Sequence, residues 1–212
     1  MSEHPIKRYG IQGDAGSFND QALQSYFSRM AIDPTTAVVE YLYTTEAVLS
    51  SLAAGSIDAG QWAIANSIDG LVERSVIAME KAGFASHCRE IARYVLPIAH
   101  CLMIHPAATL ATVTTIISHP TVFRQCANNL RMKFPHLTLQ PGAGVCEDPA
   151  YVARALKVGD LPTHTATLSS RRIAELHGLQ IVAENMQDQS PNLTTFILAE
   201  WQRPRSISGS WQ

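Results

Sequence analysis

The sequence predicts an α/β protein of two lobes, and three observations support that fold class. Strand-like apolar segments alternate with helix-like segments along the chain, which is typical of α/β layering. The length of 212 residues is compatible with either one large domain or two small lobes. A long strand-like region over residues 91–104, interrupted at Pro97, separates two groups of these units and predicts a cleft between two lobes.

The first group is predicted to contain three strand–helix pairs. Its strands cover residues 7–11, 38–43 and 59–64, and its helices cover residues 17–30, 45–54 and 68–81. Thr44 or Thr45 is expected to cap the second helix and Gly55 to end it. The apolar run 59–64 suits a buried parallel strand. The predicted first lobe is residues 1–84.

The second group repeats this arrangement. Its strands are predicted at residues 91–104, 112–117, 164–168, 181–184 and 194–200, and its helices at 121–133, 149–158 and 170–177. Ser169 or Ser170 is expected to cap the last helix, which Gly178 ends. The predicted second lobe covers residues 85–202, with hinge strands crossing between the lobes. Residues 203–212 are predicted to be a mobile tail.

Composition and charge exclude several kinds of partner. The formal net charge is −2 and the longest basic run is Arg171-Arg172, so the clustered basic surface of a nucleic-acid-binding protein is not predicted. The longest apolar stretches fall short of the roughly 20 residues that a membrane span needs. The N-terminus lacks the basic and then apolar pattern of a secretion signal, so we expect a cytoplasmic protein.

Cysteine and histidine spacing argues against a metal site. The 4 cysteines have no CxxC spacing, and although three disulfide pairings are possible, buried reduced thiols are the better expectation in a cytosolic chain. His100 and His105 are five residues apart, a spacing that shares a face on neither a helix nor a strand, and no HExxH motif occurs. We therefore predict no metal site.

Polar residues follow predicted strands at five turns. These turns are Gly16-Ser17, Thr44-Thr45, Asn66-Ser67, Ser118-His119 and Ser169-Ser170. In open α/β sheets, ligands lie at the carboxyl ends of strands, where helix N-termini offer amide donors to anions. Each turn alone is explained by helix capping, and the five together favour a small polyanionic ligand.

Five segments resemble, in the same order, motifs of the prephenate dehydratase family. They are YGIQGDAGSF (9–18), WAIANSIDG (62–70), LPIAHCLMI (96–104), SHPTVFRQC (118–126) and ATLSSRRIAELHGLQIVAENMQDQSPNLTTF (166–196). The family counterparts of the middle three read P-I-E-N-S-x-x-G, L-P-I-x-H-x-L and S-H-P-Q-A-L-x-Q-C, and the last contains N-x-T-R-F. The resemblance covers residues 7–200.

This resemblance implies a fold like that of a type II periplasmic binding protein, with the active site in the cleft between two α/β lobes. It implies prephenate, which carries two carboxylates, as the substrate, no cofactor, and a homodimer or homotetramer. Many family members carry a C-terminal regulatory domain that binds phenylalanine. The chain ends soon after its last predicted strand, so that domain is not expected.

The resemblance also suggests roles for individual residues. Thr194 matches the family threonine that helps hydroxide leave the ring, and Thr195 and His119 complete the candidate catalytic set. The proton donor stays open among Thr194, His119 and water. Candidate substrate-binding residues, which are helix caps or core residues in the alternative interpretation, are Ser17, Phe18, Thr44, Asn66, Ser67, Ser118, Ser170 and Phe196.

Several neighbouring polar residues are interpreted as structural or solvated. His100 lies on the predicted hinge strand and is expected to be structural. Arg124 is expected to be solvated. Asp188 and Asn192 are expected to shape the turn before Thr194 and not to contact substrate.

Three positions depart from the family motifs. Thr195 stands where the family has arginine, Ala65 where it has glutamate, and Thr121 where it has glutamine. Threonine cannot replace a guanidinium that holds a carboxylate. These departures favour the family's non-aromatising prephenate decarboxylase branch, a lyase of antibiotic-type secondary metabolism whose product keeps the C4 hydroxyl. The alternatives are a prephenate dehydratase of phenylalanine biosynthesis and a non-catalytic carboxylate sensor.

Overall fold

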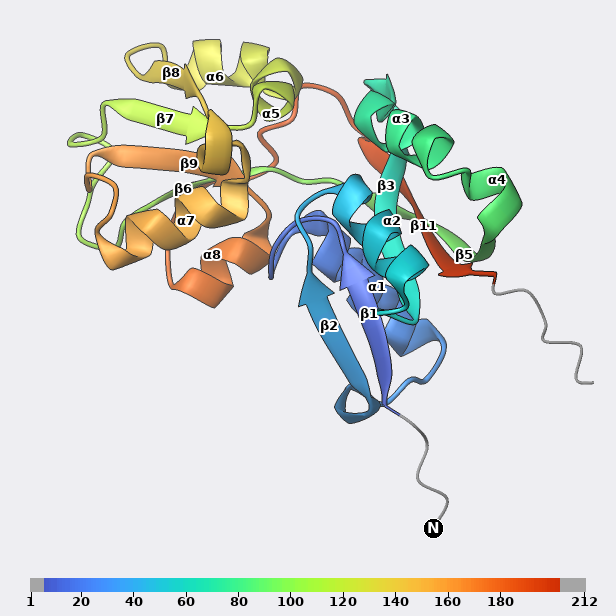
Figure 1. Ribbon diagram of the computed structural model, residues 1–212. Helices are drawn as coiled ribbons and strands as arrows, with labels where there is room; N and C mark the ends of the chain where they lie inside the picture. Colours follow the sequence, from blue (N-terminus) through green and yellow to red (C-terminus); the bar gives the residue numbers. More distant parts are fainter. Residues whose placement is uncertain (1–5, 203–212) are drawn as a thin grey trace, which may run out of the picture.

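The computed structural model describes residues 6–202 and contains two lobes, each built on its own β-sheet (Figure 1). Two extended connections join the lobes, so the chain leaves the first lobe once and returns to it. The α/β fold class and the two-lobed architecture are therefore confirmed. The predicted mobile tail over residues 203–212 lies outside the described residues.

The first lobe contains a sheet with the strand order β2-β1-β3-β11-β5, and β4 pairs with the end of β3. Its strands are β1 (Lys7–Ile11), β2 (Ala37–Tyr41), β3 (Ala59–Asn66), β4 (Gly70–Leu71), β5 (Cys88–Pro97) and β11 (Leu193–Trp201). Its helices are α1 (Phe18–Arg29), the 3-10 helix η1 (Pro34–Thr36), α2 (Thr45–Ala54), α3 (Glu73–Lys81) and α4 (Phe84–His87). β1 is parallel to β2 and β3, whereas β11 runs antiparallel to β3 and β5.

The second lobe contains a sheet with the strand order β10-β6-β9-β7-β8. Its strands are β6 (Cys101–Ile104), β7 (Thr115–Ser118), β8 (Thr138–Pro141), β9 (Thr165–Ser169) and β10 (Gln180–Ala183). Its helices are α5 (Pro120–Gln125), α6 (Ala127–Lys133), the 3-10 helix η2 (Gly144–Glu147), α7 (Pro149–Val158) and α8 (Arg171–His177). β7 is parallel to β8 and β9, and β6 is antiparallel to β9 and β10.

Each lobe buries apolar side chains of its own. Ile11, Leu23 and Phe196 are at most 1% exposed and belong to a core of the first lobe. Ile104 and Ile116 are fully buried in the second lobe. Several buried side chains near the crossing segments are polar, and they are His100, Gln125, Asn192 and Thr194. Buried polar groups need hydrogen-bond partners, so we expect these side chains to form hydrogen bonds with one another at the junction of the lobes.

The two crossing segments lie side by side and form the hinge. The backbone amide of Ile98, just after β5, donates to the carbonyl of Asn192, just before β11, over 2.7 Å. The amide of Met186 donates to the carbonyl of His100 over 2.9 Å. These bonds tie the outgoing connection to the returning one, so residues of both reach the same place.

The predicted lobe boundary at residue 84 differs from the sheet topology. β5 and β11, which we assigned to the second lobe, both pair within the sheet of the first lobe. A strand pattern predicts that a segment is extended but does not reveal the sheet in which it pairs. The chain therefore enters the second lobe after Pro97, the residue that interrupts the predicted hinge strand.

The helix predicted over residues 68–81 begins later, at Glu73, because Asn66 starts a turn of its own. The side-chain oxygen of Asn66 accepts hydrogen bonds from the backbone amides of Ile68 (2.8 Å) and Asp69 (3.1 Å). Gly70 then has a φ of 79°, and β4 returns along β3. An asparagine side chain that accepts from a backbone amide two residues later stabilises a turn, and this turn competes with helix formation. The predicted start of the helix at residue 68 was therefore wrong.

Two further differences concern the second lobe. The helix predicted over residues 121–133 is two helices, α5 and α6, which meet at Cys126. The strand β8 was not predicted, because it has only 4 residues, all exposed, and ends at Pro141. Within residues 6–202, none of the helices has the length and apolar character that crossing a bilayer requires.

Candidate active site at the hinge between the lobes

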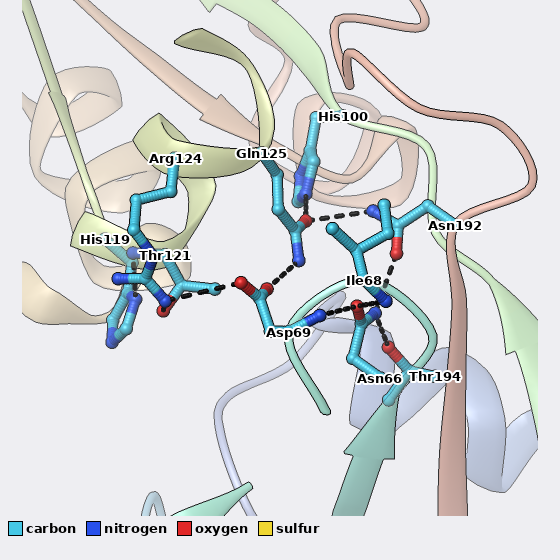
Figure 2. Close-up of polar contacts among 10 residues, drawn as sticks. All are labelled: Asn66, Ile68, Asp69, His100, His119, Thr121, Arg124, Gln125, Asn192 and Thr194. Carbon is cyan, nitrogen blue, oxygen red and sulfur yellow. Dashed lines mark hydrogen bonds and ion pairs between the residues drawn. The ribbon is translucent and has the colours of Figure 1, made fainter. Parts of the chain in front are cut away.

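Thr194 lies near the start of β11, directly opposite Asn66 at the end of β3. Asn66 Nδ2 donates a hydrogen bond to Thr194 Oγ1 over 2.9 Å (Figure 2). The orientation of the Asn66 amide is fixed, because its Oδ1 already accepts from backbone N–H groups, which can only donate. Thr194 Oγ1 therefore acts as the acceptor in this pair, and its own hydroxyl proton remains available to donate.

Two more side-chain amides continue this contact into the second lobe. Asn192 Oδ1 accepts from Asn66 Nδ2 over 2.7 Å, and Asn192 Nδ2 donates to Gln125 Oε1 over 2.9 Å. Gln125 Nε2 donates to the carboxylate of Asp69, which also lies 3.5 Å from the guanidinium of Arg124. We call the five residues joined in this way the amide chain, namely Asn66, Asp69, Gln125, Asn192 and Thr194.

His100, on the outgoing crossing segment, contacts the amide chain from the side. Its Nε2 lies 2.9 Å from Gln125 Oε1, and because a carbonyl oxygen only accepts, we place the proton of the neutral ring on Nε2. Burial lowers the pKa of His100, which favours the uncharged ring. The ring of Phe18 stands edge-on to His100, with the centroids 5.5 Å apart. Phe18 therefore reaches the hinge, and its predicted role as a wall for the substrate ring stays a prediction.

Four of the predicted site residues cap helices. Their side chains accept hydrogen bonds of 3.1 to 3.2 Å from backbone amides, and they are Ser17 (α1), Thr44 (α2), His119 (α5) and Ser170 (α8). A cap uses an acceptor lone pair of the side chain. The hydroxyl protons of Ser17 and Thr44 are therefore still free to bind a carboxylate, and that role stays a prediction for both.

Ser118 and Ser170 differ from the prediction that they bind substrate. Ser118 Oγ donates to the carbonyl of Leu168 over 3.0 Å, and Ser170 Oγ donates to the carbonyl of Gly16 over 2.7 Å. The two serines are at most 1% exposed. Each hydroxyl has one proton, so neither has a donor left for a carboxylate. Ser170 instead ties the second lobe to the first, because Gly16 precedes α1.

Phe196 also lies elsewhere than predicted. It is 1% exposed and stacks on Tyr94 inside the first lobe, with the ring centroids 6.3 Å apart. An aromatic residue at a predicted strand end has the same sequence pattern whether it fills the core or faces a cleft. Phe196 is therefore a core residue and does not form a wall of the site.

Ser67 and Thr195 flank the pair of Asn66 and Thr194. Ser67 Oγ accepts from the amide of Leu193 over 2.9 Å and lies 3.4 Å from the carbonyl of Pro191, so it fastens the turn after β3 to the start of β11. Thr195 is half-buried and faces Ala65 across the ladder. The predicted substrate contact of Ser67 and the predicted catalytic role of Thr195 are not tested by these contacts.

His119 lies on the second-lobe side of the arrangement in Figure 2. Its Nδ1 accepts from the amide of Thr121, so the neutral ring keeps its proton on Nε2. Burial lowers the pKa of His119, and the guanidinium groups of Arg74 and Arg124 lower it further. The predicted catalytic role of His119 stays a prediction, and a neutral ring in that role would act through Nε2–H.

A hollow of about 470 Å³ opens beside the N-terminus of α2. Its lining residues are Gln12, Tyr43, Thr44, Thr45, Glu46 and Arg74. Among the predicted anchors, Thr44 therefore has open space beside it. Within the described part of the chain, no three or more His, Cys, Asp or Glu side chains are grouped so that they could hold a metal ion.

Sequence reasoning missed three members of the amide chain. Gln125 lies in one of the family-like segments, and Asn192 was expected only to shape a turn. Asp69 carries no sequence signal, because it stands at a variable position between Ser67 and Gly70 of its motif. Arg124, expected to be solvated, has a side chain that is 62% exposed but contacts Asp69.

These features define a class of protein, namely two-lobed α/β proteins with a buried polar site at the hinge between the lobes. The sequence model of the family described as "Prephenate dehydratase" matches residues 9–203. The chain belongs to the prephenate dehydratase family. The resemblance noted from the five motifs is thus confirmed at the level of the family.

Curated relatives are named for dehydration of prephenate or arogenate. Arogenate dehydratase/prephenate dehydratase 1 of Arabidopsis thaliana is 26% identical over 192 residues, which are 90% of this chain and 44% of that protein. Arogenate dehydratase 1 of Petunia hybrida is 37% identical over 103 residues, 49% of this chain and 23% of that protein. The bifunctional chorismate mutase/prephenate dehydratase of Escherichia coli K12 is 30% identical over 51% of this chain and 26% of its own length. The chain spans less than half the length of these relatives.

A solved structure of similar fold is the prephenate dehydratase of Arthrobacter aurescens in complex with L-Phe. It has a TM-score of 0.77 and 25% identity and covers 93% of this chain, which in turn covers 61% of that one. GqqA, described as a novel type of quorum quenching acylase, has a TM-score of 0.70 at 23% identity, covering 96% of this chain and 67% of that chain. At that identity the second likeness supports the fold alone.

Proposed function

We propose that the protein is a lyase that removes carbon dioxide and water from prephenate or arogenate, the two substrates for which its relatives are named. The observation that carries this proposal is the pairing of Thr194 with Asn66 at the hinge, in a chain that matches the family over residues 9–203. This reading reverses the order of our two hypotheses, because the relatives support a dehydratase more strongly than a non-aromatising decarboxylase.

The proposed reaction needs a hydrogen-bond donor at the leaving hydroxyl. The ring carboxylate leaves as carbon dioxide, its electron pair enters the ring, and the C4 hydroxyl departs as hydroxide, which takes up a proton from solvent to give water. The ring thereby becomes aromatic. The Thr194 hydroxyl suits this role, because its oxygen accepts from Asn66 and its proton is free. A hydroxyl is a weak acid, so it acts by a hydrogen bond that strengthens as charge develops, worth about 3 kcal/mol.

The register between β3 and β11 gives the missing charges a second explanation. Thr195 faces Ala65 directly, so both departures from the family motifs fall on one cross-strand pair. A glutamate and an arginine at these positions would face each other, and opposite charges across a ladder attract. Losing both together leaves no unpaired charge, so the two departures require no change of reaction. The replacement of both charges together therefore supports the dehydratase.

The decarboxylase remains the second candidate because of the same pair. Ala65 and Thr195 adjoin Asn66 and Thr194 in the two strands, so the charged pair of the family motifs is replaced here by neutral side chains. An enzyme that keeps the C4 hydroxyl must not assist its departure. The weaker field near Thr194 is the observation that favours this candidate.

A product assay separates these candidates. The purified protein is incubated with prephenate and with arogenate, and the products are identified by ultraviolet absorption and mass spectrometry. The dehydratase proposal expects phenylpyruvate from prephenate or phenylalanine from arogenate. A product heavier by one water, which retains the hydroxyl, would instead establish the decarboxylase. Saturable binding without turnover would leave the carboxylate sensor.

The double variant Ala65→Glu/Thr195→Arg tests the meaning of the neutral pair. If the neutral pair of Ala65 and Thr195 does not affect which reaction occurs, the double variant gives the same product as the unmodified protein. If the neutral pair defines the reaction, the variant shifts the product toward phenylpyruvate. The single variants are matched controls, because each introduces one unpaired charge and should destabilise the protein more than the double variant.

A further inference from the structure

Asp69 connects the first lobe to the second next to the hinge. It lies in the turn between β3 and β4, and its carboxylate contacts two side chains of α5, Gln125 and Arg124 (Figure 2). Its side chain is 25% exposed. A carboxylate at this position is not needed by the turn itself, because the turn uses the backbone amide of Asp69 and the side chain of Asn66.

The carboxylate fixes the direction of the amide chain at one end. An ionised carboxylate only accepts hydrogen bonds, so Gln125 must present its NH₂ group to Asp69. Gln125 Oε1 then faces the other way and accepts from Asn192 Nδ2 over 2.9 Å, while His100 Nε2 lies equally close. Without Asp69, Gln125 Nε2 would lose this acceptor, and only the contacts of Gln125 Oε1 with Asn192 Nδ2 and His100 Nε2 would hold its side chain.

The backbone fixes the direction at the other end. Asn66 Oδ1 accepts from the amides of Ile68 and Asp69, which places Asn66 Nδ2 between Asn192 Oδ1 (2.7 Å) and Thr194 Oγ1 (2.9 Å). The two ends agree, so every amide in the chain is oriented in the same sense from Asp69 to Thr194. Among residues 6–202, the Thr194 hydroxyl makes no other side-chain hydrogen bond, so its proton is directed away from Asn66.

We propose that Asp69 is a positioning residue that aligns the Thr194 hydroxyl through Gln125, Asn192 and Asn66. The inference rests on the proposed function in that Thr194 is the donor to the leaving group. Asp69 does not contact the reacting atoms in this arrangement; it holds the Gln125 amide, which holds the next amide in turn. Because hydrogen bonds in such a network strengthen one another in a buried site, removing the terminal carboxylate loosens Thr194.

The kinetic test compares Asp69→Ala with Asp69→Asn. Asp69→Ala removes the acceptor for Gln125, and we expect kcat to fall about 10-fold while KM changes less than about 3-fold, because alignment and not binding is lost. Asp69→Asn keeps one oxygen that can accept from Gln125, so it should restore most of kcat. An unchanged kcat in Asp69→Ala, or equal losses in the two variants, would overturn the proposal.

Glu147→Gln is the matched control for a mere link between the lobes. Arg74 of α3 and Glu147 of η2 form another ion pair between the lobes, at 3.2 Å, and neither residue touches the amide chain. The positioning proposal expects kcat of Glu147→Gln to stay within about 2-fold of the unmodified protein. If it loses as much as Asp69→Ala, Asp69 only holds the lobes together and the proposal is wrong.

A spectroscopic test separates this inference from the proposed function. The side-chain NH₂ resonances of Asn66 can be assigned as those missing in Asn66→Asp and then followed by ¹H–¹⁵N correlation spectra. Asp69→Ala should shift them, because Gln125 loses its acceptor and the hydrogen bonds from Gln125 through Asn192 to Asn66 change with it, whereas the exposed Asp160→Asn should not. If the protein turns over neither prephenate nor arogenate, the proposed function is wrong. The chemical shifts of Asn66 still test, independently of turnover, whether Asp69 affects the amide chain. Unchanged Asn66 resonances in Asp69→Ala would contradict the positioning proposal.

Discussion

Two sides of the junction between the lobes use polar residues in different ways. On the capping side, Ser17, Thr44 and Ser170 accept hydrogen bonds from amides three positions later in the chain. On the hinge side, the amide chain joins residues more than 50 positions apart, such as Asp69 and Gln125. A cap satisfies its helix whether or not a ligand is bound. The amide chain instead aligns one hydroxyl group, so we expect the hinge side to govern turnover and the capping side to govern stability.

Thr194→Val is the strongest test of this division. Valine keeps the shape of threonine but removes the hydroxyl that faces the Asn66 amide, so kcat should fall about 100-fold or more. Asn66 Nδ2 retains its bond to Asn192, so the free energy of unfolding should change by no more than about 1 kcal/mol. Steady-state turnover and urea unfolding measure the two effects. Thr194→Ser keeps the hydroxyl and serves as the control, and a Thr194→Val enzyme with more than a tenth of the original kcat would contradict the division.

Gly16→Ala tests the capping side, where we expect a loss of stability. Gly16 has a φ of 78°, and an added Cβ would lie 3.0 Å from the side chain of Ile173 and 3.3 Å from its Cα. Left-handed strain costs about 1–2 kcal/mol for a residue other than glycine, and the crowding between the lobes adds to it. The melting temperature should fall by about 2–4 °C for each kcal/mol lost.

Gly159→Ala is the control for backbone strain alone. Gly159 has a φ of 87°, but nothing lies within 4 Å of its added Cβ. Its variant should therefore lose less stability than Gly16→Ala. If the two variants melt at the same temperature, the close approach of the lobes at Gly16 does not contribute, and the capping side is only a set of local caps.

The sequence predicts the capping side well because its information is local. Ser17 and Ser170 precede helices by one position, and Gly55 and Gly178 follow helices with positive φ, as their residue types predict. The order of strands and helices follows from the same local patterns. A serine at a cap gives no sign, however, of where its hydroxyl proton is donated, and for that reason the bond from Ser170 to the carbonyl of Gly16 was not predicted.

The hinge side is built from contacts between residues that are far apart in the sequence, and local sequence patterns do not predict such contacts. Thr194 and Asn66 were found through the family motifs, but their contact follows from the antiparallel register of β11 on β3. The same register places the departures at Ala65 and Thr195 on one cross-strand pair, which the sequence presented as two unrelated positions. Asp69 could not be predicted at all, because its partners belong to the other lobe.

Ser170→Ala and Thr44→Ala sharpen the comparison within the capping side. Ser170 is buried, caps α8 and donates to Gly16 across the lobes, so its loss should lower the free energy of unfolding by about 2 kcal/mol. Thr44 is exposed and only caps α2, so its loss should cost about 0.5–1 kcal/mol. Chemical denaturation measures both. Equal costs would mean that the bond between the lobes contributes nothing beyond the cap.

The pH dependence of stability gives a smaller effect that again separates the two sides. Burial lowers the pKa of His100 on the hinge side and of His177 at the end of α8. A histidine with a lowered folded pKa takes up its proton first in the unfolded chain. Its stabilising contribution is thus complete above the unfolded value of about 6.5 and is lost as the pH falls through the folded value.

In the unmodified protein, Gln125 Oε1 accepts from His100 Nε2. The variant His100→Gln removes the titrating group and keeps a side-chain donor for Gln125. Between pH 7 and about 5, the free energy of unfolding should therefore fall less steeply in His100→Gln than in the unmodified protein. His177→Gln should flatten the curve less, because His177 is only half-buried and His100 is 4% exposed. Urea unfolding at several pH values measures the slopes. If His177→Gln flattens the curve more than His100→Gln, protonation acts first on the capping side, and the hinge is not the part of the junction most sensitive to acid.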